Sequence, residues 1–179
     1  MNAMKVAILG GGNGAHTVAA DLTLKGLSVN MFEMEDFASA MQTVFDTGKI
    51  EMTGVAGQGT ARLNLVTTDI AAAIRDVEII FIILPGFTIS TYAGLLAPHL
   101  AENQTVIIMP GTFAALEFRQ ALRDNGNLQE IVTAEVGGLP FATRLVAPGK
   151  VRTFHIRAVC PLAAVPGNQG PAVFEKISG

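Results

Sequence analysis

The sequence is poor in cysteine, tryptophan and charge. Its 179 residues include one Cys, no Trp and only 15% charged residues. The single thiol, Cys160, excludes an internal disulfide and a metal site built from several cysteines. The net charge is −3, and the 12 Lys and Arg residues are scattered singly along the chain. No basic stripe is therefore present that would favour nucleic acid or an anionic membrane as a partner.

Long apolar runs and a targeting segment are also missing. The longest apolar run, residues 79–87, contains a Pro-Gly pair and is far shorter than the roughly 20 residues of a membrane-spanning helix. Only four apolar residues separate Lys5 from the first glycine, fewer than the ~7–15 in the apolar core of a signal peptide. We therefore expect a cytoplasmic protein. Its 50% apolar residues and mean hydropathy of +0.44 lie at the apolar end of the range for soluble domains.

Short β-branched runs alternate with stretches in which apolar residues recur at helical spacing. The expected strands are 5–9, 28–33, 62–67, 77–84, 104–109 and 130–135. The expected helices lie over 15–22, 37–45, 70–74 and 114–122. Strands that are apolar almost throughout are typical of a parallel sheet covered on both faces. We therefore predict an α/β fold with a doubly wound, Rossmann-type, mostly parallel sheet.

Two segments depart from this alternation. Residues 48–60 contain four glycines and predict a small hairpin in place of a crossover helix. Near the C-terminus, the runs 141–146 and 151–156 flank Ala147-Pro148-Gly149-Lys150, which predicts a second hairpin. Residues 172–177 then have the pattern of the first turns of a helix. The sheet is therefore expected to carry a C-terminal hairpin extension.

The strongest functional signal directly follows the first expected strand and reads Gly10-Gly11-Gly12-Asn13-Gly14-Ala15. It satisfies the pattern G-x-G-x-x-G/A through Gly10, Gly12 and Ala15. Gly10 permits the tight turn, Gly12 lets the backbone approach a pyrophosphate, and Ala15 lets the following helix pack closely on the sheet. Free N–H groups near Asn13 and Gly14 would face the phosphates at the positive end of the helix dipole. The sequence therefore predicts a dinucleotide-binding turn.

Glu33 ends the second expected strand, 23 residues after Gly10. This spacing is close to the ~20 residues expected for the acid that binds a ribose hydroxyl. A carboxylate there repels the 2′-phosphate of NADP, and no Arg or Lys lies between Lys25 and Lys49 to neutralise that phosphate. NAD is therefore favoured over NADP. FAD is equally compatible with an acid at this position.

The ends of the later strands are the next candidate sites, because ligands of doubly wound sheets lie across the carboxyl ends of the strands. These ends hold Leu84 and Pro85, Pro110, and Glu135. Glu135 is the one ionisable group among them, and it would either orient a substrate or nicotinamide, or cap a neighbouring backbone N–H.

The three histidines give no catalytic or metal signal. They are His16, expected to pack or bond locally, His99 at a helix end, and His155 in the second hairpin. None has a carboxylate at a recognisable spacing. We therefore assign no catalytic residues and no metal site in this chain.

Together these motifs resemble the octopine/nopaline (opine) dehydrogenase family, specifically its N-terminal nucleotide-binding domain. The likeness is carried by segments 6–16, 21–26, 32–33, 109–111 and 135–151, the last including Leu139-Pro140-Phe141-Ala142 and Arg144. It covers residues 4 to about 175 but only the first half of the family pattern. In that family, as in the related glycerol-3-phosphate dehydrogenases and ketopantoate reductases, a helical domain follows and supplies the catalytic His/Asp pair.

The resemblance implies a reductive condensation, in which NAD(P)H delivers hydride to the imine of an amino acid and a 2-oxo acid. It implies that residues 10–15 hold the pyrophosphate and Glu33 the adenosine ribose. It places the nicotinamide beside Leu84, Pro85, Pro110 and Glu135. Two departures from the family pattern matter. Met109 replaces the usual Asn, and residues 136–137, Val-Gly, replace a Thr and a small polar residue. Both changes would remove hydrogen bonds near the reacting centre.

We therefore expect a dinucleotide-binding domain over residues 1–140, followed by a hairpin and the start of a connection over 141–179. The favoured function is an NAD-dependent oxidoreductase domain that needs a helical catalytic domain or subunit. The alternative is a non-catalytic dinucleotide-binding sensor or regulatory subunit. A methyltransferase, which shares a glycine-rich first loop, is less well supported. Because a nucleotide domain without its helical partner would expose apolar surface, we also expect a homodimer.

Overall fold

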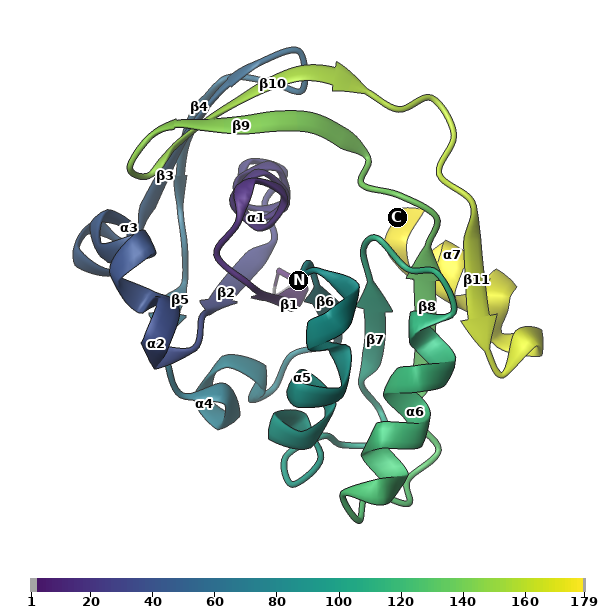
Figure 1. Cartoon of the computed structure of the whole chain (residues 1–179). Helices are drawn as coiled ribbons and strands as arrows, with labels where there is room; N and C mark the ends of the chain where they lie inside the picture. The colour runs from purple at the N-terminus through teal and green to yellow at the C-terminus, as the bar shows by residue number, and fades with distance from the viewer. Residues whose placement is uncertain (1–2, 179) are drawn as a thin grey trace.

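A computed structural model, which describes residues 3–178, places a seven-stranded sheet at the centre of the molecule (Figure 1). The strand order is β11-β8-β7-β6-β1-β2-β5. These strands are β1 (Lys5–Leu9), β2 (Ser28–Phe32), β5 (Leu65–Thr67), β6 (Ile79–Ile82), β7 (Thr105–Ile108), β8 (Val132–Val136) and β11 (Leu162–Val165). All neighbours pair in parallel except β11, which runs antiparallel to β8. From β1 the chain first adds β2 and β5 on one side and then β6, β7 and β8 on the other. The end of β1 is therefore the switch point at which such sheets bind ligands.

Side chains of β1 alternate between two hydrophobic cores, one on each face of the sheet. Val6 and Ile8 belong to one core and Ala7 and Leu9 to the other, and all four are fully buried. Burying one such Ile or Leu side chain contributes about 1.5–3 kcal/mol. This two-sided burial explains the nearly continuous apolar runs and confirms the predicted α/β fold with its mostly parallel sheet.

The helices divide between these two cores. The Val6 core includes residues of α1 (Asn13–Leu24), α3 (Gln42–Thr47) and α7 (Gly170–Ser178). The Ala7 core includes residues of α4 (Ile70–Ile74), α5 (Ile89–Leu96) and α6 (Ala114–Asp124). The shorter segments are α2 (Glu35–Ala38) and 3-10 turns at Ser39–Met41, Gly86–Thr88 and Gly167–Gln169. None of the described helices is long and apolar enough to cross a membrane.

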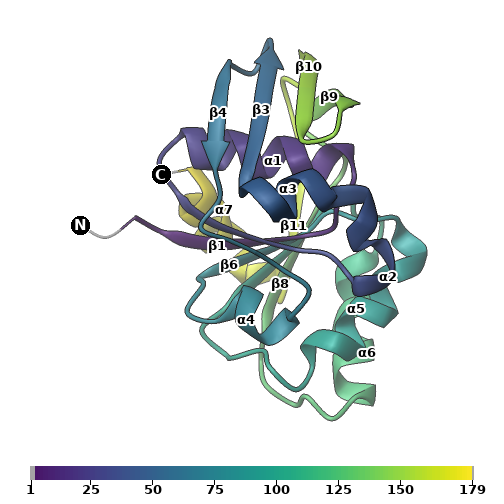
Figure 2. The same ribbon diagram turned by 90° about the vertical axis from the view of Figure 1, so that its left-hand side faces the viewer.

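A second sheet, of four strands, arches over α1 on the Val6 side of the main sheet (Figures 1 and 2). Its order is β4-β3-β10-β9. Both predicted hairpins are confirmed, as β3 (Lys49–Gly54) with β4 (Gly59–Arg62), and β9 (Phe141–Ala147) with β10 (Lys150–Ile156). The sequence did not reveal that β10 also pairs in parallel with β3, which joins the two hairpins into one sheet.

Two expectations about strands need correction. The single strand predicted over 62–67 is wrong, because Arg62 ends β4 in the second sheet and only Leu65–Thr67 joins the main sheet. Between them, Leu63 N–H donates to Gly48 O and Asn64 N–H to Val29 O, so the chain passes from one sheet to the other. The strand β11 was not expected at all, and it extends the main sheet beyond β8.

Candidate functional site

The glycine-rich turn leaves β1 beside the ends of β2 and β6. Gly10 has a φ of +118°, a left-handed conformation that favours glycine, and its N–H donates to Phe32 O at 2.9 Å. A Cβ at Gly10 would lie 2.7 Å from Ile83 O, and one at Gly11 would lie 2.7 Å from Glu33 Oε2. A side chain at Gly10 would collide with the backbone, and one at Gly11 would displace the Glu33 carboxylate.

Gly12 differs from these neighbours because the space around it is open. No atom lies within 4 Å of the position that its Cβ would take. Gly12 precedes α1, and no side chain in the described part of the chain caps the first turn of that helix. The first N–H groups of the helix are thus left for another acceptor. An open cradle at the positive end of a 12-residue helix fits a phosphate group.

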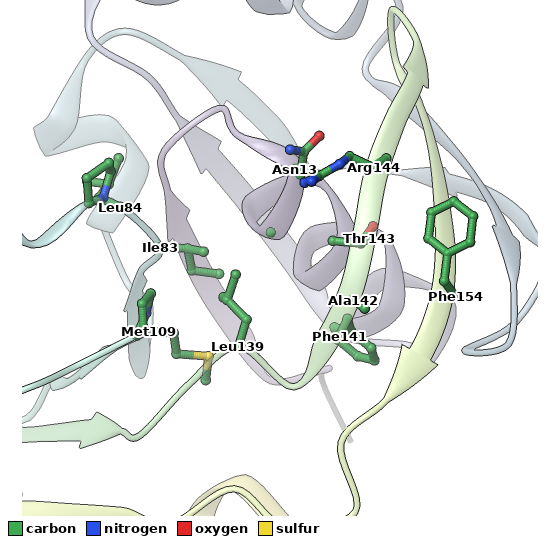
Figure 3. A pocket seen from close by; sticks show the side chains of 13 residues that line it. Asn13, Ile83, Leu84, Met109, Leu139, Phe141, Ala142, Thr143, Arg144 and Phe154 are labelled. Carbon is green, nitrogen blue, oxygen red and sulfur yellow. The ribbon is translucent and has the colours of Figure 1, made fainter.

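A first cavity, of about 670 Å³, opens beside the start of α1 (Figure 3). It is lined by Asn13, Gly14, Ile83, Leu84, Pro85, Met109, Pro110, Leu139, Phe141, Ala142, Thr143, Arg144 and Phe154. Most of these side chains are apolar, and Arg144 is the one charged residue in this lining. The first cavity can therefore hold a flat, mostly apolar group with an anionic group at its edge.

Strand β9 is held against α1 by two hydrogen bonds. Asn13 Oδ1 accepts from Leu145 N–H at 2.7 Å, and the hydroxyls of Thr17 and Thr143 lie 2.6 Å apart. Arg144 lies between Thr143 and Leu145 on β9, and its side chain reaches toward Asn13 (Figure 3). No ion pair of Arg144 occurs among the described residues. A guanidinium without a carboxylate partner is thus held near the start of α1.

A second cavity, of about 540 Å³, lies on the other side of the turn. It is lined by Gly11, Glu33, Met34, Phe37, Ala40, Leu84, Pro85, Phe87, Thr88, Thr91 and Tyr92. Leu84 and Pro85 line both cavities, and Gly11 and Asn13, each in one lining, flank the open Gly12. The two cavities therefore meet at the switch point of the sheet.

The buried acid of the second cavity is Glu33, which is 7% exposed. Its Oε1 accepts from Met34 N–H at 2.8 Å and from the Tyr92 hydroxyl at 3.0 Å. The Tyr92 ring packs edge-on against Phe32, with ring centroids 6.0 Å apart. Burial raises the pKa of Tyr92 above its usual value, and the negative charge of Glu33 raises it further. The Tyr92 hydroxyl therefore stays protonated and donates to Glu33.

Residues 5–137 match the family model described as NAD-dependent glycerol-3-phosphate dehydrogenase N-terminus. The chain belongs to this family. It is also 36% identical over 172 residues to an opine dehydrogenase of Arthrobacter sp. (strain 1C), a match that covers 96% of this chain and 47% of that protein. The chain thus spans about half the length of this relative. The similarity confirms the predicted resemblance and identifies an NAD(P)-binding domain of dehydrogenase type.

Solved structures of opine-type dehydrogenases share the fold. Octopine dehydrogenase in complex with NADH and agmatine has a TM-score of 0.78 at 22% identity, covering 90% of this chain and 42% of that one. Yersinopine dehydrogenase with NADP+ bound has a TM-score of 0.83 at 16% identity, covering 99% of this chain and 45% of that one. These two proteins of the same fold bind different nicotinamide cofactors, so the likeness of fold does not decide between NAD and NADP.

The structure brings most of the residues expected in the site together. Leu84, Pro85 and Pro110, which follow the ends of β6 and β7, all line the first cavity. Ala15 is fully buried and belongs to the Val6 core, as expected of the position where the helix packs on the sheet. Asn13 has an additional structural role, because its side-chain oxygen binds β9.

Glu135 binds two backbone N–H groups at the start of α6. Its Oε1 accepts from Phe113 N–H at 3.1 Å and its Oε2 from Ala115 N–H at 2.9 Å, and it lines neither cavity. Phe113 precedes α6 with a φ of +60° and offers no side-chain acceptor to the helix. The carboxylate on β8 therefore caps α6, which is the second of the two roles that the sequence left open.

Of the three histidines, one is buried and two are exposed. His16 is buried and its Nδ1 lies 3.1 Å from Gly12 O, so the expected local bonding is confirmed. Burial lowers the pKa of His16, so the ring is neutral at physiological pH. His99 and His155 are exposed, and residues 3–178 contain no group of three or more potential metal ligands.

Sequence reasoning missed Tyr92 and the position of Arg144. Arg144 was noted only as part of the family-like segment, because no local pattern indicates that β9 folds back onto α1. Tyr92 is the one tyrosine in the chain, but its contact with Glu33 spans 59 residues. Such contacts between distant segments leave no spacing signal in a single sequence.

Proposed function

We propose that this chain binds NAD(H) as the nucleotide domain of an opine-dehydrogenase-type oxidoreductase. The observation that supports the proposal is the pair of cavities that meet at Leu84 and Pro85 beside the open Gly12 turn. Two linked cavities with a phosphate cradle between them match an extended dinucleotide at the switch point of a doubly wound sheet.

The lining residues fit the parts of such a cofactor. The second cavity would take the adenosine, with Glu33 accepting a ribose hydroxyl. The pyrophosphate would lie against Gly12 and the first N–H groups of α1. The nicotinamide would enter the first cavity, where Met109, Pro110 and Leu139 exclude water from one side. When bound, the nicotinamide supplies the hydride, and this chain supplies binding and orientation.

The choice of NAD over NADP is proposed from the charge near the ribose. Glu33 is the one charged residue lining the second cavity, and a 2′-phosphate there would meet a buried carboxylate. No Lys or Arg occurs from residue 26 to residue 48 to offset that repulsion. A site for NADP usually carries an arginine near this ribose position.

Arg144 supplies the positive charge for the pyrophosphate in this proposal. It lines the first cavity next to Asn13 and has no ion-pair partner among the described residues. A guanidinium forms charge-assisted hydrogen bonds with phosphate oxygens. The helix start and Arg144 would thus bind the diphosphate from two sides.

The activity proposed for a complete protein is the reductive condensation of an amino acid with a 2-oxo acid. The described residues hold no His/Asp catalytic pair in the two cavities. We therefore propose that a helical domain or subunit supplies the catalytic groups, as the opine dehydrogenase resemblance implies. Met109 lines the first cavity where the family pattern has Asn, so the substrate contacts would differ from those of typical members.

Titration of the chain with NADH, followed by cofactor fluorescence, tests the binding proposal. We expect saturable binding that is lost in Gly12→Val, because the added side chain fills the open cradle. Gly167→Val is the matched control, since it adds the same side chain where nothing lies within 4 Å and no cavity is lined. Absence of binding by the unmodified chain, or equal binding by Gly12→Val, contradicts the proposal.

The sensor alternative is separated by an activity measurement. If NADH binds but is not oxidised with any pair of amino acid and 2-oxo acid, even after addition of the helical domain of a relative, the enzyme proposal fails. Binding without turnover under those conditions supports a non-catalytic module.

A further inference from the structure

The two carboxylate oxygens of Glu33 have different surroundings. Oε1 accepts two hydrogen bonds, from Met34 N–H and from the Tyr92 hydroxyl. Oε2 receives no hydrogen bond from the described residues and faces Gly11, where a Cβ would lie 2.7 Å from it. The carboxylate is therefore fixed by one oxygen, and the other oxygen is directed at the glycine-rich turn.

No positive charge stabilises this buried carboxylate among the described residues. None of the four ion pairs includes Glu33. Its orientation depends on one backbone N–H from its own segment and one side chain from α5. Glu33 follows β2, and Tyr92 lies on α5, which follows β6; β2 and β6 flank β1 on opposite sides. The bond between Tyr92 and Glu33 therefore connects the two halves of the sheet across the proposed cofactor site.

We infer that Tyr92 is a positioning residue for nucleotide choice: its hydroxyl fixes Glu33 so that Oε2 accepts a ribose 2′-hydroxyl and cannot turn away from a 2′-phosphate. A carboxylate held by a single bond can rotate to reduce its repulsion of a phosphate, whereas one held by two bonds keeps its charge in place. The inference rests on the proposed binding of NAD(H). It concerns the selectivity of that site.

Tyr92→Phe isolates the hydroxyl, because the ring and its edge-on contact with Phe32 are retained. The variant loses a hydrogen bond that orients the charged Glu33 carboxylate. We therefore expect Tyr92→Phe to bind NADH about five- to tenfold more weakly. NADPH binding should change less. The dissociation constant for NADPH divided by that for NADH, which measures the preference for NADH, should therefore fall. Ser90→Ala is the matched control on α5: it removes a hydroxyl bond to Glu117, 2.8 Å long, that lies outside both cavities.

A double-mutant cycle distinguishes positioning from a structural effect. Dissociation constants for NADH and NADPH are measured for the unmodified chain, Tyr92→Phe, Glu33→Gln and the double variant. We expect Tyr92→Phe to change the ratio only when Glu33 is present. If Tyr92→Phe changes the ratio equally in both backgrounds, or changes it in neither, Tyr92 does not act through Glu33 and the inference is overturned.

A spectroscopic readout tests the contact without any cofactor. Tyr92 is the one tyrosine and the chain has no tryptophan, so the near-ultraviolet absorption band of the neutral phenol reports this residue alone. The band should shift in Glu33→Gln at neutral pH, because the charged acceptor of the hydroxyl bond is removed. An unchanged band overturns the contact. If the unmodified chain binds neither nucleotide, the proposed function fails as well, whereas NADH binding with an unaltered ratio in Tyr92→Phe refutes only the positioning role.

Discussion

Removal of the Arg144 side-chain charge gives a quantitative test of how the second sheet contributes to cofactor binding. The neighbours of Arg144 are fixed to α1, through the 2.7 Å bond from Leu145 N–H to Asn13 and the 2.6 Å contact between Thr143 and Thr17. The backbone of Arg144 therefore cannot move far from the start of the helix. Arg144→Met keeps most of the apolar stem and removes only the guanidinium.

The expected loss follows from a charge-assisted hydrogen bond at a solvent-exposed edge. Arg144 is exposed, so the interaction is partly screened, and its contribution is about 1–2 kcal/mol. This corresponds to a roughly 5- to 30-fold rise in the dissociation constant for NADH. The effect should shrink at high salt, because screening weakens exposed charge interactions.

The assay is calorimetric titration of NADH at low and high ionic strength. Arg152→Met is the matched control, because Arg152 lies opposite Arg144 on β10, stacks over Phe154 and does not line the first cavity. It should change the dissociation constant by less than about twofold. Equal effects of the two substitutions would refute a specific role for Arg144, since both remove one positive charge from the same sheet.

Three further predictions follow from buried contacts and exposed surface. Thr17→Val should lower the free energy of unfolding by about 1–2 kcal/mol in urea, and the double variant with Thr143→Val should lose less than the two single losses added together; additive losses would argue against the bond. Because burial holds the pKa of His16 below its ordinary value of 6.5, the unfolded chain binds the proton more readily, and stability should fall as the pH drops below that value. Denaturant unfolding at pH values above and below 6.5 should show a smaller loss of stability at low pH in His16→Asn than in the unmodified chain. An unchanged pH dependence in His16→Asn would contradict the lowered pKa of His16. Exposed apolar side chains outside both cavities, such as Val159, 72% exposed, predict a homodimer, which a clean monomer in sedimentation at micromolar concentration would disprove.

Local backbone geometry accounts for what the sequence predicted well. Gly10 occupies a left-handed conformation against Ile83 O, and such steric demands are visible as glycines at fixed spacing. The two-sided burial of β1 is likewise visible as an apolar run. Asp69, a residue type that favours the start of a helix, caps α4 by accepting from two backbone N–H groups at 2.9 and 3.2 Å.

Contacts between distant segments account for what the sequence did not show. The pairing of β10 with β3 joins segments about a hundred residues apart, and neither strand carries a mark of its partner. The sequence left two roles open for Glu135, because its hydrogen bonds depend on the backbone at Phe113. The left-handed conformation of Phe113 leaves the start of α6 without a side-chain cap from that residue, and Glu135 provides one. The hydrogen bond between Tyr92 and Glu33 likewise joins distant segments, because it forms only when α5 lies across from the end of β2.

Hydrogen exchange of the backbone amides with and without NADH tests the central claim most directly. We expect slower exchange in three regions when NADH is present: the turn at residues 10–15, the segment 33–41 at the second cavity, and the segment 139–145 at the first. The Gly12→Val variant should show no such protection. Unchanged exchange in the unmodified chain, or protection confined to regions away from both cavities, would contradict a dinucleotide lying across the end of β1.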